Sequence, residues 1–297
     1  MSRETLKKKV TVIIVTFKSE HIIEKCLDNI GPNYNIILLE NSNNVEFTNY
    51  LKKKYLNLDC INIGYDSGFG YALNRGIEKV KSEYIISINP DSFPEKDCFT
   101  KLVETADNHE DAVCVVPLTY LKNKTKEFNS YGYFDKKKKL IKTDDNKLEV
   151  DWVNGNVALI KKSIFNEIGL FDENFFIEYD ERDFQKRIYK TRKKVIIDFD
   201  AKSEHLDGKS ANEKYTFQMR CEKTWHHAWS RYYYYKKHYG LLYSLYINLP
   251  LSILSLIKMT VFYILNNKNK SKLHRLALMG FFNSLLNNKS FYRAEID

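Results

Sequence analysis

The chain is poor in the residues that break or cross-link a fold. Its 297 residues include only 11 glycines, 5 prolines and 5 cysteines. So little glycine and proline excludes a collagen-like chain and argues against a disordered one. The cysteines are odd in number and never spaced as Cys-x-x-Cys, so neither a disulfide framework nor a zinc knot is expected. We therefore expect a cytosolic protein in a reducing environment.

Acidic residues are almost missing from the C-terminal part of the chain. From Arg231 onwards, ten Lys and Arg residues are opposed by only two acids, Glu295 and Asp297. A basic tail of this kind indicates nucleic acid or anionic lipid as a partner. The preceding part is near neutral, and a hydrophobic content of 43% is enough for one large domain with an appendage. The basic N-terminus runs directly into a strand-like segment, so no signal peptide is expected.

Strand-like and helix-like patterns alternate through the first part of the chain. The strand-like runs are "VTVIIVTF", "NIILLENS", "LDCINIG" and "EYIISINPD", and amphipathic helical patterns separate them. This alternation predicts an α/β fold with a parallel sheet flanked by helices. Ligands bind such sheets at the carboxyl ends of the strands, where these runs turn polar. We expect a catalytic domain over residues 1–210 and a helical extension over 211–297.

Polar residues follow the first two strands at this edge. The strands end in Thr16 and Phe17 and in Glu40, Asn41 and Ser42. A carboxylate placed there can accept hydrogen bonds from a nucleotide base or from ribose hydroxyls. The alternative is ordinary turn chemistry and helix capping by Asn and Ser.

A glycine-rich loop and a short Asn-Pro-Asp turn supply two further candidates. "NIGYDSGFGYALNRG" runs into a helix and lets backbone approach a ligand, although it matches neither a dinucleotide fingerprint nor a P-loop. In "INPD", Pro90 ends a buried strand and places Asp91 beyond it. A carboxylate there suits a hard divalent cation, and a plain turn is the alternative. His205 lies in the polar loop expected after the last strand. It is a candidate site residue only if it is a second ligand of the metal held by Asp91.

The segment "FFIEYDERDF" crowds four carboxylates behind two phenylalanines. Asp180 has the position of a helix N-cap. The spacing of Asp183 and Arg187 predicts a surface ion pair. Glu181 shares a helical face with two apolar residues further on, so we expect it to be the acid against an apolar wall, with a raised pKa.

Taken in order, these pieces resemble the family 2 glycosyltransferases of the GT-A fold over about the first 210 residues. The matching runs are "VTVIIVTFKSE", "LLENSNN", "NIGYDSGFGYALNRGI", "INPD", "VNGNVALIKKSIFNEIGLFDENFFIEYDERDF" and "SEHLDGKS". The pattern "FDENFFIEYDERDF" looks most like bacterial rhamnosyltransferases and the related galactofuranosyltransferases.

The resemblance implies a role for individual residues of the nucleotide site. Thr16 and Glu40 match positions that contact the base and ribose, with Glu40 standing where the family usually has aspartate. Asp66 and Asn74 lie in the loop, with Gly68, that lines the nucleotide-sugar pocket. These residues, with Phe17 and Asn41, form the expected donor site.

For the catalytic centre, the resemblance implies a metal site and a base. "INPD" stands for the family's Asp-x-Asp motif, with Asn89 in place of the first acid. Asp91 and His205 would then hold Mg²⁺ or Mn²⁺. Asp180 and Glu181 match the acidic pair that supplies the base, and the sequence leaves open which of the two takes the proton because Glu181 replaces the usual aspartate.

The resemblance therefore implies an inverting, metal-dependent glycosyltransferase. It would use a dTDP- or UDP-linked donor, with a rhamnose-like deoxyhexose favoured, and a glycan or lipid-linked glycan acceptor. One alternative is a sugar-phosphate nucleotidyltransferase, but "VTFKSEH" lacks the glycine-rich loop that such enzymes carry after the first strand. Another is an inactive, membrane-bound glycan-binding protein, which the retained acids and histidine argue against.

The tail mixes aromatic and basic residues with a long apolar run. Leu241–Leu265 is long enough to span a bilayer, but Asn248, Pro250 and Lys258 interrupt it. We expect two amphipathic segments in the membrane interface, on the cytoplasmic face of the membrane. The run Tyr232–Tyr235 could stack on bases, yet the apolar residues after it fit lipid better, so no nucleic acid is expected. The alternative is that these helices pack on the catalytic domain or, as a homodimer, on a second copy.

Overall fold

The computed structural model describes residues 3–121, 127–135, 141–142, 145–206, 208–210, 212–294 and 296. The chain divides into two compact units. The first comprises Met1–Phe171 and Phe184–Asn212, and the second comprises Asp172–Asp183 and Glu213–Asp297. The acidic segment that the sequence analysis assigned to the catalytic domain thus groups with the C-terminal helices.

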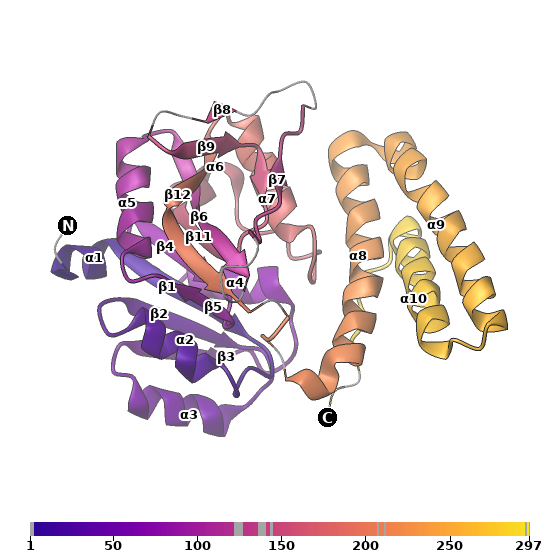
Figure 1. Ribbon diagram of the computed structural model, residues 1–297, viewed down its shortest axis with the longest axis horizontal. Helices are drawn as coiled ribbons and strands as arrows, with labels where there is room; N and C mark the ends of the chain where they lie inside the picture. The colour runs from indigo at the N-terminus through magenta and orange to yellow at the C-terminus, as the bar shows by residue number, and fades with distance from the viewer. Residues whose placement is uncertain are drawn as a thin grey trace. The chain divides into compact units, whose positions relative to one another are not determined.

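Four parallel strands form one half of the sheet in the first unit (Figure 1). A short helix, α1 (Arg3–Lys9), leads into them. Their order is β3-β2-β1-β4, and helices α2, α3 and α4 connect them as the sequence predicts. Strand β1 is buried at all but one position, as its β-branched run indicates. The bounds are β1 (Val10–Thr16), α2 (Ile23–Ile30), β2 (Asn35–Glu40), α3 (Val45–Lys54), β3 (Leu58–Asn62), α4 (Phe69–Ile77) and β4 (Tyr84–Ile88).

The other half of the sheet is mixed. Strand β11 (Val157–Lys161) runs antiparallel between β4 and β6 (Ala112–Leu121), and β6 is parallel to β12 (Lys194–His205). Strands β9 (Lys147–Val150) and β8 (Ile141–Lys142) complete the edge. The short β5 (Ser92–Pro94) pairs with the end of β12, while β10 (Trp152–Val153) and β7 (Tyr131–Gly132) form a separate ribbon.

This topology corrects one expectation. His205 does not lie in a loop: it is the last residue of β12 and lies opposite Ser92 of β5. Pairing with β5 extends the strand past the apolar run that the sequence pattern detects. The alternating sequence "DFDAKSEH" is polar enough to read as a loop, but pairing with β5 and β6 holds it as a strand.

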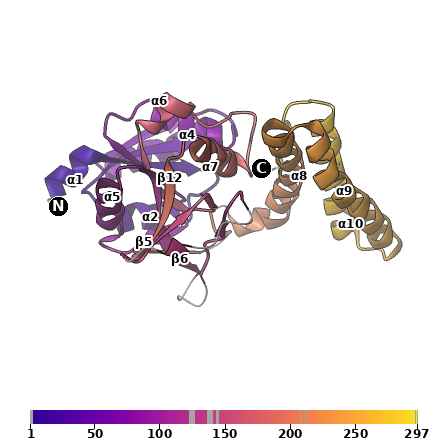
Figure 2. The same cartoon turned by 90° about the horizontal axis from the view of Figure 1, so that it is seen from above.

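Helices cover both faces of the sheet (Figure 2). One apolar core joins the sheet to α2, α3 and α5 (Cys98–Asn108). A second core, on the opposite face, joins it to α4, α6 (Ile164–Ile168) and the later turns of α7 (Asp180–Lys190). Because the sheet has two buried faces, its central strands are mostly apolar.

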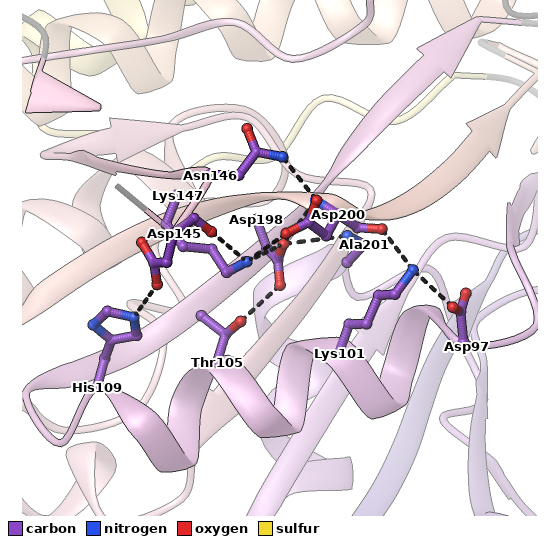
Figure 3. A network of polar contacts seen from close by, with 10 residues as sticks. All are labelled: Asp97, Lys101, Thr105, His109, Asp145, Asn146, Lys147, Asp198, Asp200 and Ala201. Carbon is purple, nitrogen blue, oxygen red and sulfur yellow. Dashed lines mark hydrogen bonds and ion pairs between the residues drawn. The ribbon is translucent and has the colours of Figure 1, made fainter. Parts of the chain in front are cut away.

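A buried ion pair links β9, β12 and α5 (Figure 3). The ammonium of Lys147 lies 3.0 Å from Asp198, whose side chain is 1% exposed. Thr105 of α5 donates a 2.7 Å hydrogen bond to the same carboxylate. The backbone N–H groups of Asp200 and Ala201 also donate to it. The carboxylate is therefore fully compensated, as a buried charge must be.

The second unit contains three long helices, α8 (Thr216–Tyr239), α9 (Leu241–Ile264) and α10 (Lys268–Leu285), preceded by the short η2 (Glu213–Tyr215). A helical extension is thus confirmed. Helices α8 and α10 pack closely at Gly280, where a Cβ atom would lie 2.2 Å from the carbonyl oxygen of Trp225.

The expected interruption of the apolar run is wrong, because α9 continues through Pro250. Asn248 is buried and donates to the carbonyl of Ser244 one turn earlier, so it supports the helix instead of breaking it.

We predict that Asp198→Ala destabilises the chain by about 3–5 kcal/mol, because it leaves the buried Lys147 ammonium without its principal partner. Asp200→Ala is the matched control. Its carboxylate is half-exposed and contacts the same ammonium, so its loss should reduce stability by less than about 1 kcal/mol. Urea denaturation of the two variants measures the difference. Equal losses in the free energy of unfolding would show that the buried Asp198 contributes no more to stability than the half-exposed Asp200.

Candidate active site

At the ends of β1 and β2, Glu40 is buried and turned inward. Thr16 donates its hydroxyl to one carboxylate oxygen at 2.8 Å, and the backbone N–H of Ser42 donates to the other at 2.5 Å. Burial raises the pKa of Glu40, while these hydrogen bonds act in the opposite direction and only partly offset it. Glu40 therefore organises the edge that a nucleotide would approach.

A cavity of about 410 Å³ opens beside this edge. Ser42 is part of its wall, and the backbone N–H of Lys18 donates to the Ser42 hydroxyl at 2.6 Å. Lys18 and Asn43 both have left-handed backbone conformations (φ 51° and 57°), which are uncommon for such residues and recur at functional sites. Phe17 is half-buried beside them, and its N–H donates to Ser19. The lining residues are Lys18, Glu20, Ser42, Asn43, Asn44, Val45 and Glu46.

Most of these lining residues were not singled out from the sequence. Asn44 caps α3 by accepting from the N–H of Phe47 and donates to Glu20 at 2.9 Å. Glu20 and Asn44 come from two loops that follow neighbouring strands. In the sequence, these lining residues are marked only by the run of polar residues after each strand. Such a run predicts that a site lies there but does not show which residues form it.

The glycine-rich loop is fastened to the end of β2. Asn41 donates to the carbonyl of Gly68 at 3.2 Å and accepts from the Ser67 hydroxyl at 3.0 Å. Gly68 has φ +83°, a conformation that suits glycine, and its N–H points to Asp66 at 3.4 Å. The structure thus brings Asn41, Asp66 and Gly68 together.

Asn74 has a different place. It is buried, and its side-chain amide forms two reciprocal hydrogen bonds with the backbone of Phe171, at 2.9 and 3.0 Å. The amide ties α4 to the residue that precedes the acidic segment. In the structure, the Asn74 side chain therefore holds the backbone at Phe171 against α4.

Asp91 and His205 meet at the ends of β4 and β12. Asp91 is fully buried, and its carboxylate lies 3.2 Å from Nε2 of His205 and accepts the backbone N–H of Lys209 at 3.2 Å. Burial opposes ionisation of Asp91, but the hydrogen bond and charge of His205 outweigh it, so the pKa lies below its ordinary value. Asn89, on the same turn, is half-buried and donates its backbone N–H to the carbonyl of Asn156.

The donors of this pair suit a divalent metal. The carboxylate of Asp91 suits Mg²⁺ or Mn²⁺, and the imidazole of His205 suits a transition metal such as Mn²⁺ better than it suits Mg²⁺. Nδ1 of His205 is buried and has no hydrogen-bond partner in the part of the chain that the structure describes. Among those same residues, no three or more His, Cys, Asp or Glu side chains form a cluster that could hold a metal ion by itself. A cation held here would therefore take further oxygen ligands from a substrate.

In the second unit, α7 begins with the buried acid Asp180. Its side chain is buried, and burial raises its pKa to about 7, reinforced by the charges of Glu178 and Asp183. We expected Glu181 to be the acid against an apolar wall, but Asp180 is more deeply buried than Glu181, which is only partly buried. Glu178 and Tyr179 both have φ +67°. This left-handed turn determines which side of α7 faces inward. The spacing of residues along the helix does not show that a turn of this kind precedes it.

The neighbouring acids are held by α8. Asp183 is fully buried and accepts from His238 at 2.8 Å and Lys237 at 2.6 Å. Glu178 lies 3.0 Å from His227. Asp183 is thus a buried acid held by α8, and the prediction that it is a surface acid is wrong. Arg187 donates to the carbonyl of Ile168 at 2.6 Å.

The partners supplied by α8 lie more than 40 positions away in the sequence, and no local motif marks them. Helix spacing favoured the i, i+4 partner of Asp183. A buried carboxylate needs stronger compensation than an exposed ion pair supplies, and Lys237 and His238 of α8 provide it.

Residues 11–169 match the sequence model described as glycosyl transferase family 2. This match covers more than half of the chain. The chain belongs to glycosyltransferase family 2.

Individual relatives agree with this assignment. The chain is 23% identical, over 65% of its length, to "Low-salt glycan biosynthesis hexosyltransferase Agl10" of Haloferax volcanii, and it spans 65% of that relative. Among solved structures, it is similar to the Pyrobaculum calidifontis mannosyltransferase PcManGT, in complex with GDP-Man and Mn²⁺ (11% identity, TM-score 0.56). That similarity covers 95% of this chain and 88% of the other.

Two further structures have the same fold. The chain is similar to GalNAc-T7 with UDP, GalNAc and Mn²⁺ (17% identity, TM-score 0.55), over 76% of this chain and 49% of the other. It is also similar to S. aureus TarS 1-349 (12% identity, TM-score 0.54), over 97% of this chain and 94% of the other. The expected GT-A fold is confirmed. The solved structures bear on the fold alone, and the matches reported above do not single out the rhamnosyltransferases.

We predict a pH-dependent difference in stability between the enzyme and its Asp180→Asn variant. The pKa of Asp180 is about 7 in the folded chain, against an ordinary value of 3.8. Between these values folding takes up a proton, so the enzyme loses stability as the pH rises through this window. The side-chain amide of the variant cannot ionise, so the variant should be more stable at pH 8, by up to about 4 kcal/mol, and not at pH 4.

Urea denaturation at the two pH values measures this difference. Glu173→Gln, which changes an exposed acid of the same segment, is the control and should follow the unmodified enzyme. A gap between the enzyme and the Asp180→Asn variant that is the same at pH 4 and pH 8 would contradict the raised pKa.

Proposed function

We propose that this enzyme is an inverting, metal-dependent glycosyltransferase that transfers a sugar from a nucleoside diphosphate donor to a glycan acceptor. The observation that carries the proposal is Asp180, a buried carboxylate whose pKa of about 7 suits a general base at neutral pH. Family membership supplies the reaction class. The inverting course and the individual residue roles are what we add.

The donor would bind at the ends of β1 and β2. Thr16, Phe17, Glu40 and Asn41 surround this edge, and the adjoining cavity is large enough to take part of a nucleotide. A uridine or deoxythymidine diphosphate donor is proposed. A rhamnose-like deoxyhexose is the first sugar to test, because "FDENFFIEYDERDF" resembles that branch of the family, and hexoses such as mannose come next.

Asp91 and His205 would hold Mg²⁺ or Mn²⁺. When bound, the cation would neutralise charge on the departing diphosphate. Asn89, Asp66 and Gly68 would line the path of the phosphates and the sugar. Support comes from the paired carboxylate and imidazole, and from the Mn²⁺ named with GalNAc-T7 and PcManGT.

Asp180 would accept the proton of the acceptor hydroxyl as that oxygen attacks the anomeric carbon. One base and a single displacement invert the anomeric centre, as in inverting hydrolases. Glu181, half-exposed and next in sequence, would orient the acceptor. The acceptor itself is proposed to be a lipid-linked or cell-surface glycan, consistent with the glycan-biosynthesis role in the name of the Haloferax relative.

We predict that Asp180→Asn lowers kcat by at least about a hundredfold, because it removes the general base. Glu181→Gln should lower kcat far less and should mainly raise KM for the acceptor. Steady-state release of nucleoside diphosphate with and without acceptor measures both. If Glu181→Gln abolishes turnover while Asp180→Asn remains active, the assignment of the base is reversed.

A donor screen with Mg²⁺ or Mn²⁺, read as nucleoside diphosphate release, should show turnover that EDTA abolishes and added metal restores. Asp91→Asn should raise the Mn²⁺ concentration needed for half-maximal rate by at least about tenfold, because it removes an anionic ligand. Asp97→Asn, which changes an exposed acid near α5, is the control. Full activity of Asp91→Asn in EDTA would contradict the metal role.

A further inference from the structure

We propose that the outward face of α9 docks onto the surface of an anionic lipid bilayer. This helix has the reverse of the usual arrangement in a water-soluble protein. Its only buried residues are Ser244, Asn248 and Ser252, whereas its large apolar side chains are exposed. Such an arrangement suits a helix whose outer environment is apolar.

The polar strip on α9 is satisfied inside the second unit. Ser244 donates its hydroxyl to the carbonyl of Tyr232 on α8 at 2.8 Å. Arg231, also on α8, donates to the side-chain oxygen of Asn248 at 2.8 Å. Ser252 donates to the carbonyl of Asn248. These bonds fix which side of α9 faces the neighbouring helices and leave the apolar side outward.

The outward side is too apolar for a surface that meets only water. Six of its large side chains are between 52% and 82% exposed: Leu242, Tyr246, Ile253, Ile257, Tyr263 and Ile264. Contiguous apolar surface of this extent marks a binding face. Tyrosines near both ends of the helix are suited to the boundary between hydrocarbon and water.

The charge around this face selects lipid as the occupant. No aspartate or glutamate lies between Glu222 and Glu295, whereas Lys258 lies within α9 and the start of α10 carries Lys268, Lys270 and Lys272. These cations complement anionic headgroups. A second copy of the chain would place like charges against like charges, which disfavours self-association through this face.

The helix would lie along the membrane and would not cross it. By length and composition alone, α9 could span a bilayer. It packs, however, against α8 and α10, so crossing would carry Lys258 and the charged residues of both neighbours into hydrocarbon. An interfacial position buries the apolar side and keeps the cations at the headgroups.

Flotation of the full-length chain with vesicles, without sugar nucleotide or metal, tests the proposal independently of the proposed function. Vesicles of phosphatidylglycerol and phosphatidylcholine should bind the chain, and vesicles of phosphatidylcholine alone should bind it more weakly. The double variant Leu254→Glu, Ile257→Glu should bind anionic vesicles at least about tenfold more weakly, because two apolar side chains no longer insert.

A matched control replaces exposed apolar residues of the first unit. Val45→Glu, Leu56→Glu adds the same charge at positions that are 49% and 99% exposed, and it should bind as the unmodified chain does. A second variant set leaves the apolar face intact. Lys268→Gln, Lys270→Gln and Lys272→Gln should each weaken binding to anionic vesicles about fivefold, with no change for neutral vesicles.

Three results would overturn the proposal. The first is no binding to anionic vesicles by the unmodified chain. The second is equal loss of binding in the α9 double variant and in the control. The third is a dimer in analytical ultracentrifugation that the α9 double variant abolishes, without vesicle binding, because the face would then be an interface between copies. The lysine variants keep the test decisive if circular dichroism shows that the α9 double variant is unfolded.

Discussion

A buried carboxylate must be compensated, and this constraint organises both units of the molecule. Asp198 is compensated by Lys147 and by hydrogen bonds from α5 and the backbone. Asp91 is paired with His205, and Asp183 with His238 and Lys237. Each arrangement joins segments distant in the sequence, so the charges also decide how strands and helices are held together.

Asp180 is the exception to this pattern. It is buried like the others, yet no Lys, Arg or His among the described residues forms an ion pair with it, and its pKa rises to about 7. The nearby Asp183, by contrast, lies 2.6 Å from Lys237 and 2.8 Å from His238. A carboxyl group with a pKa near neutral is typical of acid–base catalysis. The acids of the crowded "EYDERD" segment thus have different surroundings.

The two units carry different parts of the proposed chemistry. The first provides the edge formed by β1 and β2, the fastened glycine-rich loop, and the pair of Asp91 and His205. The second provides the acidic segment and, in α9, a helix whose polar side is satisfied internally and whose apolar side is outward. A transferase acting on a lipid-linked acceptor would gain from such a helix, because docking confines enzyme and acceptor to the same surface.

The sequence by itself determined the alternation of strands and helices, the family, and the residues that end each strand, because these depend on local periodicity and on motifs read in order. It also singled out Asp91, His205 and the pair Asp180 and Glu181 as candidates. Only the tertiary structure decided that Asp180 is the buried acid, that Asp183 binds α8, that Asn74 clamps Phe171, and that His205 ends a strand. It also decided that α9 is continuous, with its polar residues inward. These outcomes depend on backbone turns and on partners tens of residues away, and residue spacing along one helix or strand carries no information about either.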